Sequence, residues 1–283
     1  MELYPEKDFE IVTQAEDSNS LSNQIVAISK SLANTQIQWT LEQRKLFYMC
    51  LTKIAWRKDG NNPEIILDKK EITETLRLKL DSKHRSQYLR SAFRKLADNS
   101  HVHWTDPDDS EVWEDGRLIR RVRSTRGEII VLFDDYYMPH LQNLAQSYIT
   151  FLTDDVYSFK SKFSYILFHE LRLHCDTRRT NLRTYTTKQL KELFGLSKDD
   201  YVRKDGKFDR YSFEKKVLDV AIEEINGTKM VQLQPLPAME ATPKNPNKLY
   251  EKVKKGGLVV GYRLKYIVKV KTTPPEGEYE DGK

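Results

Sequence analysis

Residues 211–228 read YSFEKKVLDVAIEEINGT, and this stretch decides how the whole chain is interpreted. Its apolar residues recur at the spacing of one broad helical face, so we expect a single amphipathic helix that the Asn226-Gly227 pair ends. The charges run against the helix dipole, with cations in the first turns and acids in the last: Lys215, Lys216, Glu223 and Glu224. Because the dipole penalty is small and is screened by salt, contact of the first turns with a polyanion would outweigh it.

The segments on either side of this helix predict its setting. Upstream we expect a long helix, a short extended piece and a second helix, at 163–175, 183–186 and 186–195. A capping box of Thr186 and Gln189 opens the second of these helices, and Gly195 ends it. Downstream we expect the two strands of a hairpin, at 229–236 and 257–268.

The same order of elements occurs earlier in the chain. An amphipathic helix over 40–56 is followed by a strand, a short helix, a third helix and a hairpin, at 64–67, 68–76, 84–99 and 101–133. Asp68 and Glu71 form the capping pair of the short helix. Two helix–helix pairs, each followed by a hairpin, predict an α+β fold of two tandem winged helix-turn-helix domains. The predicted divisions are an acidic tail, domain 1, domain 2 and a second acidic tail, at 1–20, 21–150, 151–271 and 272–283.

Composition points to a polyanionic partner. The formal net charge of +5 understates the basic character, because acidic residues concentrate in the two tails. Lysine and arginine cluster at 117–126, 172–183 and 248–271, although a solvated basic face would explain composition equally well. No apolar run approaches the about 20 residues of a membrane helix, and the acidic N-terminus lacks signal-peptide features. We expect a cytoplasmic protein in which Cys50 and Cys175 are reduced and lie in buried helices.

Each repeat contains a helix whose polar face suits the major groove. In 211–228 the apolar face belongs to the core, and the polar face starts with basic residues, as in a recognition helix. In 84–99 the apolar face is formed by Tyr88, Leu89, Ala92, Phe93 and Leu96. Another face carries Lys83, Gln87, Arg90 and Arg94. Glutamine and arginine can recognise adenine and guanine, respectively, through paired hydrogen bonds. The alternative to DNA recognition, for either helix, is a polar face that is simply solvated.

The second repeat resembles the Rep_3 family, the replication initiators of iteron-containing plasmids. YSFEKKVLDVAIEEIN, followed by a strand and by GGLVVGYRLKY, is similar to the family's aromatic-x-x-basic-basic-x-Leu…Glu-Ile-Asn helix and its V-x-G-[FY]-x-[FL] return strand. The first repeat is similar more loosely, through LSNQIVAISKSL and TLEQRKLFYMCL. The resemblance covers residues 20–270.

The resemblance implies that two winged-helix domains clamp one face of a DNA duplex, each with a helix in a major groove. As a monomer, such a protein binds the repeated origin sites, called iterons, and helps to open adjacent AT-rich DNA. As a homodimer joined through the first domain, in equilibrium with the monomer, it represses its own promoter. The family also implies binding to the host initiator protein and the replicative helicase.

The candidate DNA-binding residues come partly from the resemblance and partly from the helix pattern. The resemblance places the start of the second recognition helix at Arg210, Ser212, Lys215 and Lys216. The pattern selects, for the first, Lys83, Gln87, Arg90 and Arg94. Further phosphate contacts are expected from the wings, at Arg117, Arg121, Arg123, Lys254 and Lys255. On a strand Arg121 and Arg123 share one face and Arg120 lies opposite. The second wing, 235–257, departs from the family pattern because it is long and rich in proline, and Lys252 is a further candidate there.

Two other functions stay open. A tandem winged-helix repressor would bind DNA without supporting replication. A metal-dependent rolling-circle nickase would use His101 and His103 as ligands and Tyr211 as nucleophile, but the flanks of the histidines do not suit a buried central strand. His169 and His174 lie about 140° apart on a helix, so they cannot form an H-E-x-x-H zinc site. With no phosphate-binding loop and no Ser/His/Asp motif, we expect no enzyme, metal or cofactor.

Overall fold

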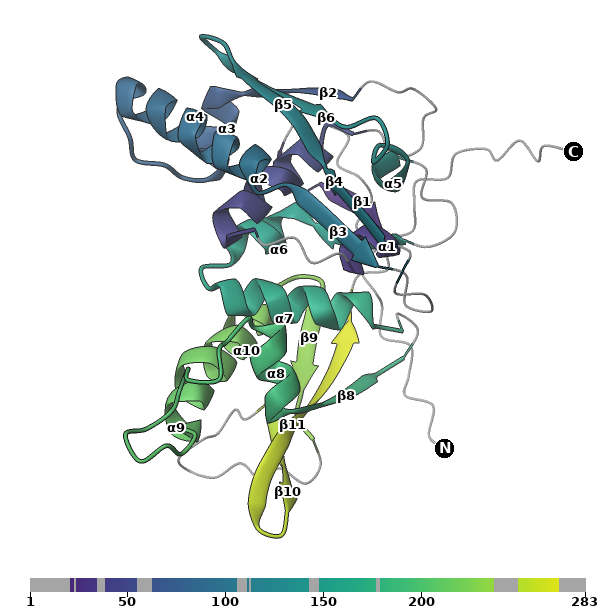
Figure 1. Ribbon diagram of the computed structural model, residues 1–283, viewed down its shortest axis with the longest axis vertical. Coiled ribbons are helices and arrows are strands. Elements are labelled where there is room, and N and C mark those ends of the chain that lie inside the picture. The colour runs from purple at the N-terminus through teal and green to yellow at the C-terminus, as the bar shows by residue number, and fades with distance from the viewer. Residues whose placement is uncertain are drawn as a thin grey trace, which may run out of the picture. The chain divides into compact units, whose positions relative to one another are not determined.

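The chain divides into two compact units (Figure 1). The N-terminal unit holds the described residues up to Tyr157, and the C-terminal unit holds those from Ser158. The computed structural model describes residues 21–22, 24–34, 39–54, 63–105, 111, 113–142, 148–176, 179–236 and 249–269. The predicted acidic tails lie outside these residues, and the domain limits drawn from the sequence stay a prediction.

The N-terminal unit contains the predicted winged-helix order. Its elements are α2 (Leu41–Leu51), β2 (Glu64–Asp68), α3 (Lys69–Thr75), α4 (Ser82–Asp98), β5 (Ile119–Ser124) and β6 (Glu128–Phe133). Strands β2, β6 and β5 form an antiparallel sheet in that order. Thr40 opens α2 through a capping box with Gln43, and the Asp68 side chain accepts from the backbone N–H of Glu71 at the start of α3. Helix α2 is shorter than the apolar spacing over 40–56 predicts.

One predicted hairpin is partly wrong. Strand β3 (His101–Thr105) pairs with β4 (Trp113–Arg117) in a separate two-stranded sheet, and only β5 and β6 form the wing hairpin. The sequence of β4, WEDGR, shows no apolar alternation that would predict a strand. The unit also contains α1 (Lys30–Asn34), α5 (Pro139–Gln142), α6 (Thr153–Ser158) and the paired strands β1 (Ile25–Ser29) and β7 (Tyr148–Leu152).

The inward face of α4 fixes this helix in the N-terminal core. Leu89, Phe93 and Leu96 are fully buried, as the pattern predicts. Burying one such side chain contributes about 1.5–3 kcal/mol, so this face holds the opposite, polar face outward. Tyr88 departs from the prediction, because it is half-buried and its hydroxyl donates to the Glu42 carboxylate on α2.

The C-terminal unit repeats the helix pair and adds a larger sheet. Its elements are α7 (Lys162–Leu173), β8 (Asn181–Thr186), α8 (Thr187–Leu193), α9 (Arg210–Phe213), η1 (Glu214–Leu218), α10 (Asp219–Asn226), β9 (Val231–Gln234), β10 (Tyr250–Lys255) and β11 (Leu258–Val268). Strand β11 pairs with β10, β8 and β9. The predicted capping box of Thr186 and Gln189 is present, and Gly195 follows α8 with a φ of 62°.

The predicted helix over 211–228 is confirmed as the run α9–η1–α10. It ends at Asn226, with Gly227 as C-cap. Its middle, η1, is a π-helical turn, which the sequence did not indicate. Such single turns inside α-helices occur frequently at functional sites. We call the run from Arg210 to Asn226 the C-terminal recognition helix, and α4 the N-terminal one.

The described part of the second wing contains one more strand than its sequence predicts. The predicted pairing of β9 with β11 is present, and β10 pairs with β11 as well. A two-residue turn of Gly256 and Gly257 joins β10 to β11, with φ values of 55° and 80° that favour glycine. At Gly261 a Cβ would lie 2.3 Å from the Tyr185 carbonyl oxygen, so β11 can approach β8 only without a side chain there. Residues 237–248 of the predicted long wing lie outside the described part.

Two further expectations concern cysteines and membranes. Cys50 is buried in α2, where burial raises the pKa of its thiol. Cys175 was expected in a buried helix, but it follows the end of α7 and is half-buried. Within the described residues, no helix has the length and apolar character that crossing a membrane requires.

Candidate nucleic-acid interface

The C-terminal recognition helix starts with a side-chain cap. Asp209 accepts from Ser212 twice, from the backbone N–H at 3.3 Å and from Oγ at 2.7 Å. These bonds, helped by the charges of Arg203 and Lys216, hold the pKa of Asp209 below its usual value. The Ser212 hydroxyl therefore stabilises the first turn of the helix and directs its proton to Asp209 rather than outward.

Lys215 and Lys216 are both exposed on this helix, yet their surroundings differ. Lys215 Nζ lies 2.8 Å from Asp219 Oδ2, one turn along the helix, and this hydrogen bond raises the pKa of Lys215. Among the described residues, Lys216 has no carboxylate within ion-pair distance. Half of the Lys215 side chain remains accessible, so the ion pair leaves both cations within reach of an external anion.

The π-helical turn brings a carboxylate into the core beside the wing. Glu214 is 8% exposed, and its two oxygens accept from Lys252 Nζ at 2.7 Å and from the Tyr262 hydroxyl at 3.1 Å. Lys252 lies on β10 and Tyr262 on β11, so this carboxylate ties the recognition helix to both wing strands. A contact of Lys252 with the DNA backbone stays a prediction, although one of its three N–H donors is directed to Glu214.

The acidic end of the recognition helix has a structural task. Glu224 Oε2 accepts from the backbone N–H groups of Lys160 and Ser161 at 3.1 and 3.2 Å. These donors lie just before α7, where the helix leaves backbone N–H groups without intrahelical partners. The reversed charge pattern of 211–228 thus combines an acidic end that caps a neighbouring helix with a basic end that stays exposed.

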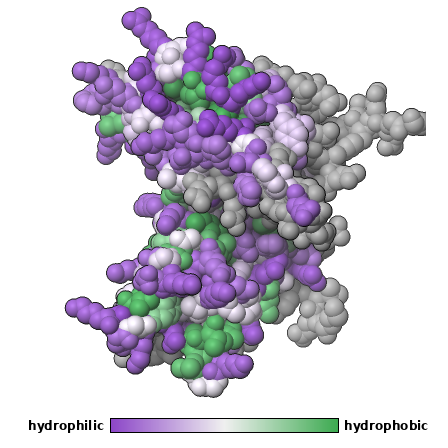
Figure 2. All heavy atoms as spheres, viewed as in Figure 1, coloured by the Kyte–Doolittle hydropathy of each residue, from purple (hydrophilic) through white to green (hydrophobic). Residues whose placement is uncertain are grey.

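Arg210 and the wing lie beside this basic end. Arg210 Nη2 donates to the Val259 carbonyl oxygen on β11 at 3.5 Å, while its buried Nε has no hydrogen-bond partner within the part of the chain that the structure describes. Lys254 and Lys255 are exposed near the tip of the wing. Leu258, at the tip itself, is 69% exposed. Figure 2 shows apolar side chains gathered on the wing, among polar ones.

In the N-terminal recognition helix, all four predicted side chains point outward. Lys83, Gln87, Arg90 and Arg94 are exposed. Arg94 Nε lies 3.8 Å from Asp98 Oδ2, and both side chains are largely exposed, so this pair is weak. Arg90 makes no ion pair with any described residue. This helix therefore presents a polar and basic face opposite its buried one.

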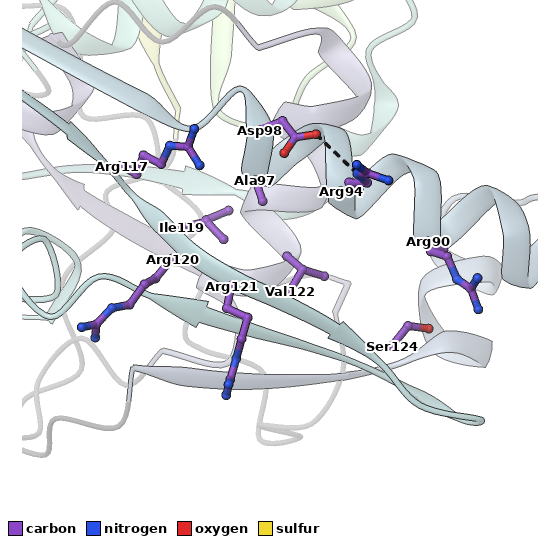
Figure 3. A pocket seen from close by; sticks show the side chains of 10 residues that line it. All are labelled: Arg90, Arg94, Ala97, Asp98, Arg117, Ile119, Arg120, Arg121, Val122 and Ser124. Carbon is purple, nitrogen blue, oxygen red and sulfur yellow. Dashed lines mark ion pairs between the residues drawn. The ribbon is translucent and has the colours of Figure 1, made fainter.

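A shallow pocket of about 330 Å³ lies between α4 and the first wing (Figure 3). Ala97, Ile119 and Val122 lie at its centre. The charged and polar residues around them are Arg90, Arg94, Asp98, Arg117, Arg120, Arg121 and Ser124. The arginine side chains spread outward in Figure 3 rather than converging on one point. Such an arrangement suits an extended anionic surface better than a single small anion.

A β-bulge changes the predicted alternation on β5. The register of β5 against β6 shifts between Ile119 and Arg121. Arg121 and Arg123 still share a face, opposite Leu132 and Ile130 of β6. Arg120, in the bulge, is exposed and pairs with Asp135 at 3.0 Å. Arg121 and Arg123 make no ion pair with described residues, whereas Arg120 already has a partner within the unit.

The sequence pattern missed two further groups of cations. A pocket of about 450 Å³ lies at the turn between α3 and α4, and its lining includes Lys70, Arg77, Lys79 and Arg85. Arg77 adopts a φ of 52° there, which is uncommon outside glycine. The loop before α9 carries Arg203, Lys204 and Lys207, all exposed. Both groups of cations lie at the turn between the two helices of a predicted pair, and this position in the sequence would have predicted them.

The alternative chemical sites gain no support from the geometry. His101 and His103 are exposed on β3, which has one strand partner and is not the central strand a nickase uses. His174 Nε2 lies 3.6 Å from Glu170, and the His169 ring stacks on Tyr165. Among the described residues, no group of three or more His, Cys, Asp or Glu side chains is arranged to hold a metal ion.

Comparison with known proteins identifies both domains. Residues 25–172 match the family model described as initiator replication protein, WH1, and residues 186–266 match the model described as initiator Rep protein, WH2. No curated protein matches the chain. Both units are therefore winged-helix domains, as the order of their elements predicted.

Two solved structures that match the chain do so at low sequence identity. The Pi initiator protein, solved in complex with iteron DNA, matches with a TM-score of 0.64 and 16% identity, over 87% of this chain and 98% of that one. Domains 2 and 3 of RctB match with a TM-score of 0.45 and 12% identity, over 93% of this chain and 96% of that one. The likeness to Pi supports the same fold, with two winged-helix domains in one chain.

Proposed function

The chain belongs to the family of initiator replication proteins, and we propose on this premise that it starts plasmid replication by binding iterons in the origin. The observation that carries the proposal is the exposed basic face of a recognition helix in each winged-helix domain. Arg90 and Gln87 lie on one of these faces, and Lys216 on the other. Pi, a protein of the same fold, was solved in complex with iteron DNA.

In this proposal the two kinds of contact have different tasks. Exposed lysines and arginines neutralise phosphates and supply affinity that falls as salt rises. The recognition helices supply discrimination, since Gln87 and Arg90 can form paired hydrogen bonds with base edges. The wing residues Arg121, Arg123 and Lys254 add contacts to phosphates beside each groove.

The wider activities of the family are part of the same proposal. A monomer bound to the iterons would help to open AT-rich DNA and would recruit the host initiator protein and the replicative helicase. A homodimer joined through the N-terminal domain would repress the promoter of its own gene. We place the protein in the cytoplasm, with double-stranded DNA as its principal partner. Family members are DNA-binding initiators and not catalytic enzymes, which removes the nickase alternative.

A replication assay separates this function from simple repression. A plasmid that carries the origin but lacks the gene for this protein should replicate only when the protein is supplied from a second plasmid. Scrambling the origin repeats should abolish replication while leaving the second plasmid unaffected. Tight, repeat-specific DNA binding without replication would identify the protein as a tandem winged-helix repressor instead.

A further inference from the structure

Asp219 stands between the basic face of the C-terminal recognition helix and the wing. Its Oδ2 accepts the 2.8 Å bond from Lys215 Nζ, and its Oδ1 accepts from the Tyr250 hydroxyl at 3.1 Å. Tyr250 is 3% exposed on β10 and packs edge-to-face against Tyr262 of β11. One oxygen of the Asp219 carboxylate is thus fixed by the buried Tyr250 side chain, and the other binds the exposed Lys215 amino group.

This arrangement differs from that of an ordinary surface ion pair. The Asp219 side chain is 29% exposed, whereas the i,i+4 pairs Arg94–Asp98 and Lys188–Glu192 each have acids that are 63% exposed. An exposed pair must order both of its side chains, so it gains little. Here Asp219 is already ordered by Tyr250, and only Lys215 loses freedom. Burial also raises the pKa of Tyr250, which further favours the protonated hydroxyl that donates to Asp219.

We propose that Asp219 is a positioning residue that makes DNA binding selective, because it fixes the Lys215 amino group over one point of the recognition helix. The inference rests on the proposed function. A lysine side chain that rotates freely can reach a phosphate on a duplex of any sequence, which strengthens non-specific binding. A lysine held by Asp219 contributes fully only where a base or phosphate lies at the matching place, since its ordering cost is met before binding. Lys216, without such a partner, is left to contact phosphates on any sequence.

The chain offers a matched control for this idea. Glu223 lies one turn beyond Asp219 on the same helix, is exposed, and has no lysine or arginine within ion-pair distance among the described residues. Asp219→Asn and Glu223→Gln each remove one negative charge and keep the shape of the side chain. In Asp219→Asn the amide oxygen can still accept from Tyr250, while the Lys215 ion pair is lost. A difference between the variants therefore does not come from net charge, and a Lys215→Ala background assigns it to Lys215.

The experiment measures the preference of the full-length protein for a specific duplex. The probes are a duplex selected from a random library by the wild-type protein and a shuffled duplex of equal length, titrated at several salt concentrations. Glu223→Gln should tighten binding to both probes equally and leave the preference unchanged. Asp219→Asn should lower the preference by about threefold to tenfold, the effect of releasing one long side chain. In a Lys215→Ala background, Asp219→Asn should no longer lower it.

Every other outcome decides against the inference. Equal preferences for Asp219→Asn and Glu223→Gln overturn it, and so does an Asp219→Asn effect that persists without Lys215. Tyr250→Phe, which removes the anchor and keeps the ring, should lower the preference in the same direction, so the test does not depend on the folding of one variant. If the wild-type protein itself shows no preference for any selected duplex, the proposed function fails, and this inference fails with it.

Discussion

Replacing Phe213 with alanine should destabilise the C-terminal unit by about 3–5 kcal/mol, the usual cost of deleting a buried aromatic side chain. Phe213 is fully buried in the recognition helix. Its ring centroid lies 6.4, 5.7, 5.4 and 6.1 Å from those of Phe194, Tyr201, Phe208 and Tyr262. One side chain therefore joins the recognition helix to the end of α8, to the preceding loop and to the wing. DNA binding by this unit should weaken in parallel.

Chemical denaturation with tryptophan-independent detection, such as far-ultraviolet circular dichroism, measures this loss. Tyr211→Ala is the matched control, because Tyr211 lies in the same helical turn and is 69% exposed. The free energy of unfolding of the Tyr211→Ala variant should differ from that of the wild-type protein by no more than about 0.5 kcal/mol. Equal unfolding midpoints for the two variants would mean that Phe213 does not hold the recognition helix in place.

The double variant Arg90→Ala with Lys216→Ala should bind the selected duplex about a hundredfold more weakly than the wild-type protein, and each single variant about tenfold. The two effects should multiply, because the residues lie in separate units and share no partner. If both side chains contact phosphates, the slope of log affinity against log salt should fall by about two. Neither substitution removes an ion pair with a described residue, so the folded state should keep its stability.

Titration of a labelled duplex at several salt concentrations gives both quantities. Lys229→Ala serves as the control, since Lys229 is exposed just beyond the opposite, acidic end of the C-terminal recognition helix. It should leave affinity nearly unchanged. A loss confined to one of the two single variants would show that only one domain contacts DNA.

Local rules predicted the helices well because their signals lie within a few residues. Thr186 and Gln189 cap α8 as expected, and Asn226-Gly227 ends the recognition helix. The exposed faces followed from the same 3.6-residue period, so the outward position of Arg90 and Lys216 could be read from the sequence. The sequence could not show which of these cations forms an ion pair, because that depends on neighbours elsewhere in the fold.

The partners of Glu214 and Asp219 were missed because they lie far away in the chain. Glu214 looks like a surface acid in EKK, but Lys252 and Tyr262 on the wing strands stabilise it within the core. Strand β10, YEKVKK, lacks apolar alternation and is formed by pairing with β11. The Tyr250 hydroxyl that orients Asp219 belongs to the same strand. A pattern of polar residues cannot reveal such hydrogen-bond partners, because the same residue types also occur in solvated loops.

We expect each winged-helix domain to place its recognition helix in a major groove of the same duplex. Methylation protection of guanine N7, which faces the major groove, tests it on the selected duplex with the full-length protein. We expect two clusters of protected guanines, about one helical turn apart and on the same face, with Arg90→Ala exposing one cluster and Lys216→Ala the other. A single protected groove, or clusters that neither variant alters, would contradict the account.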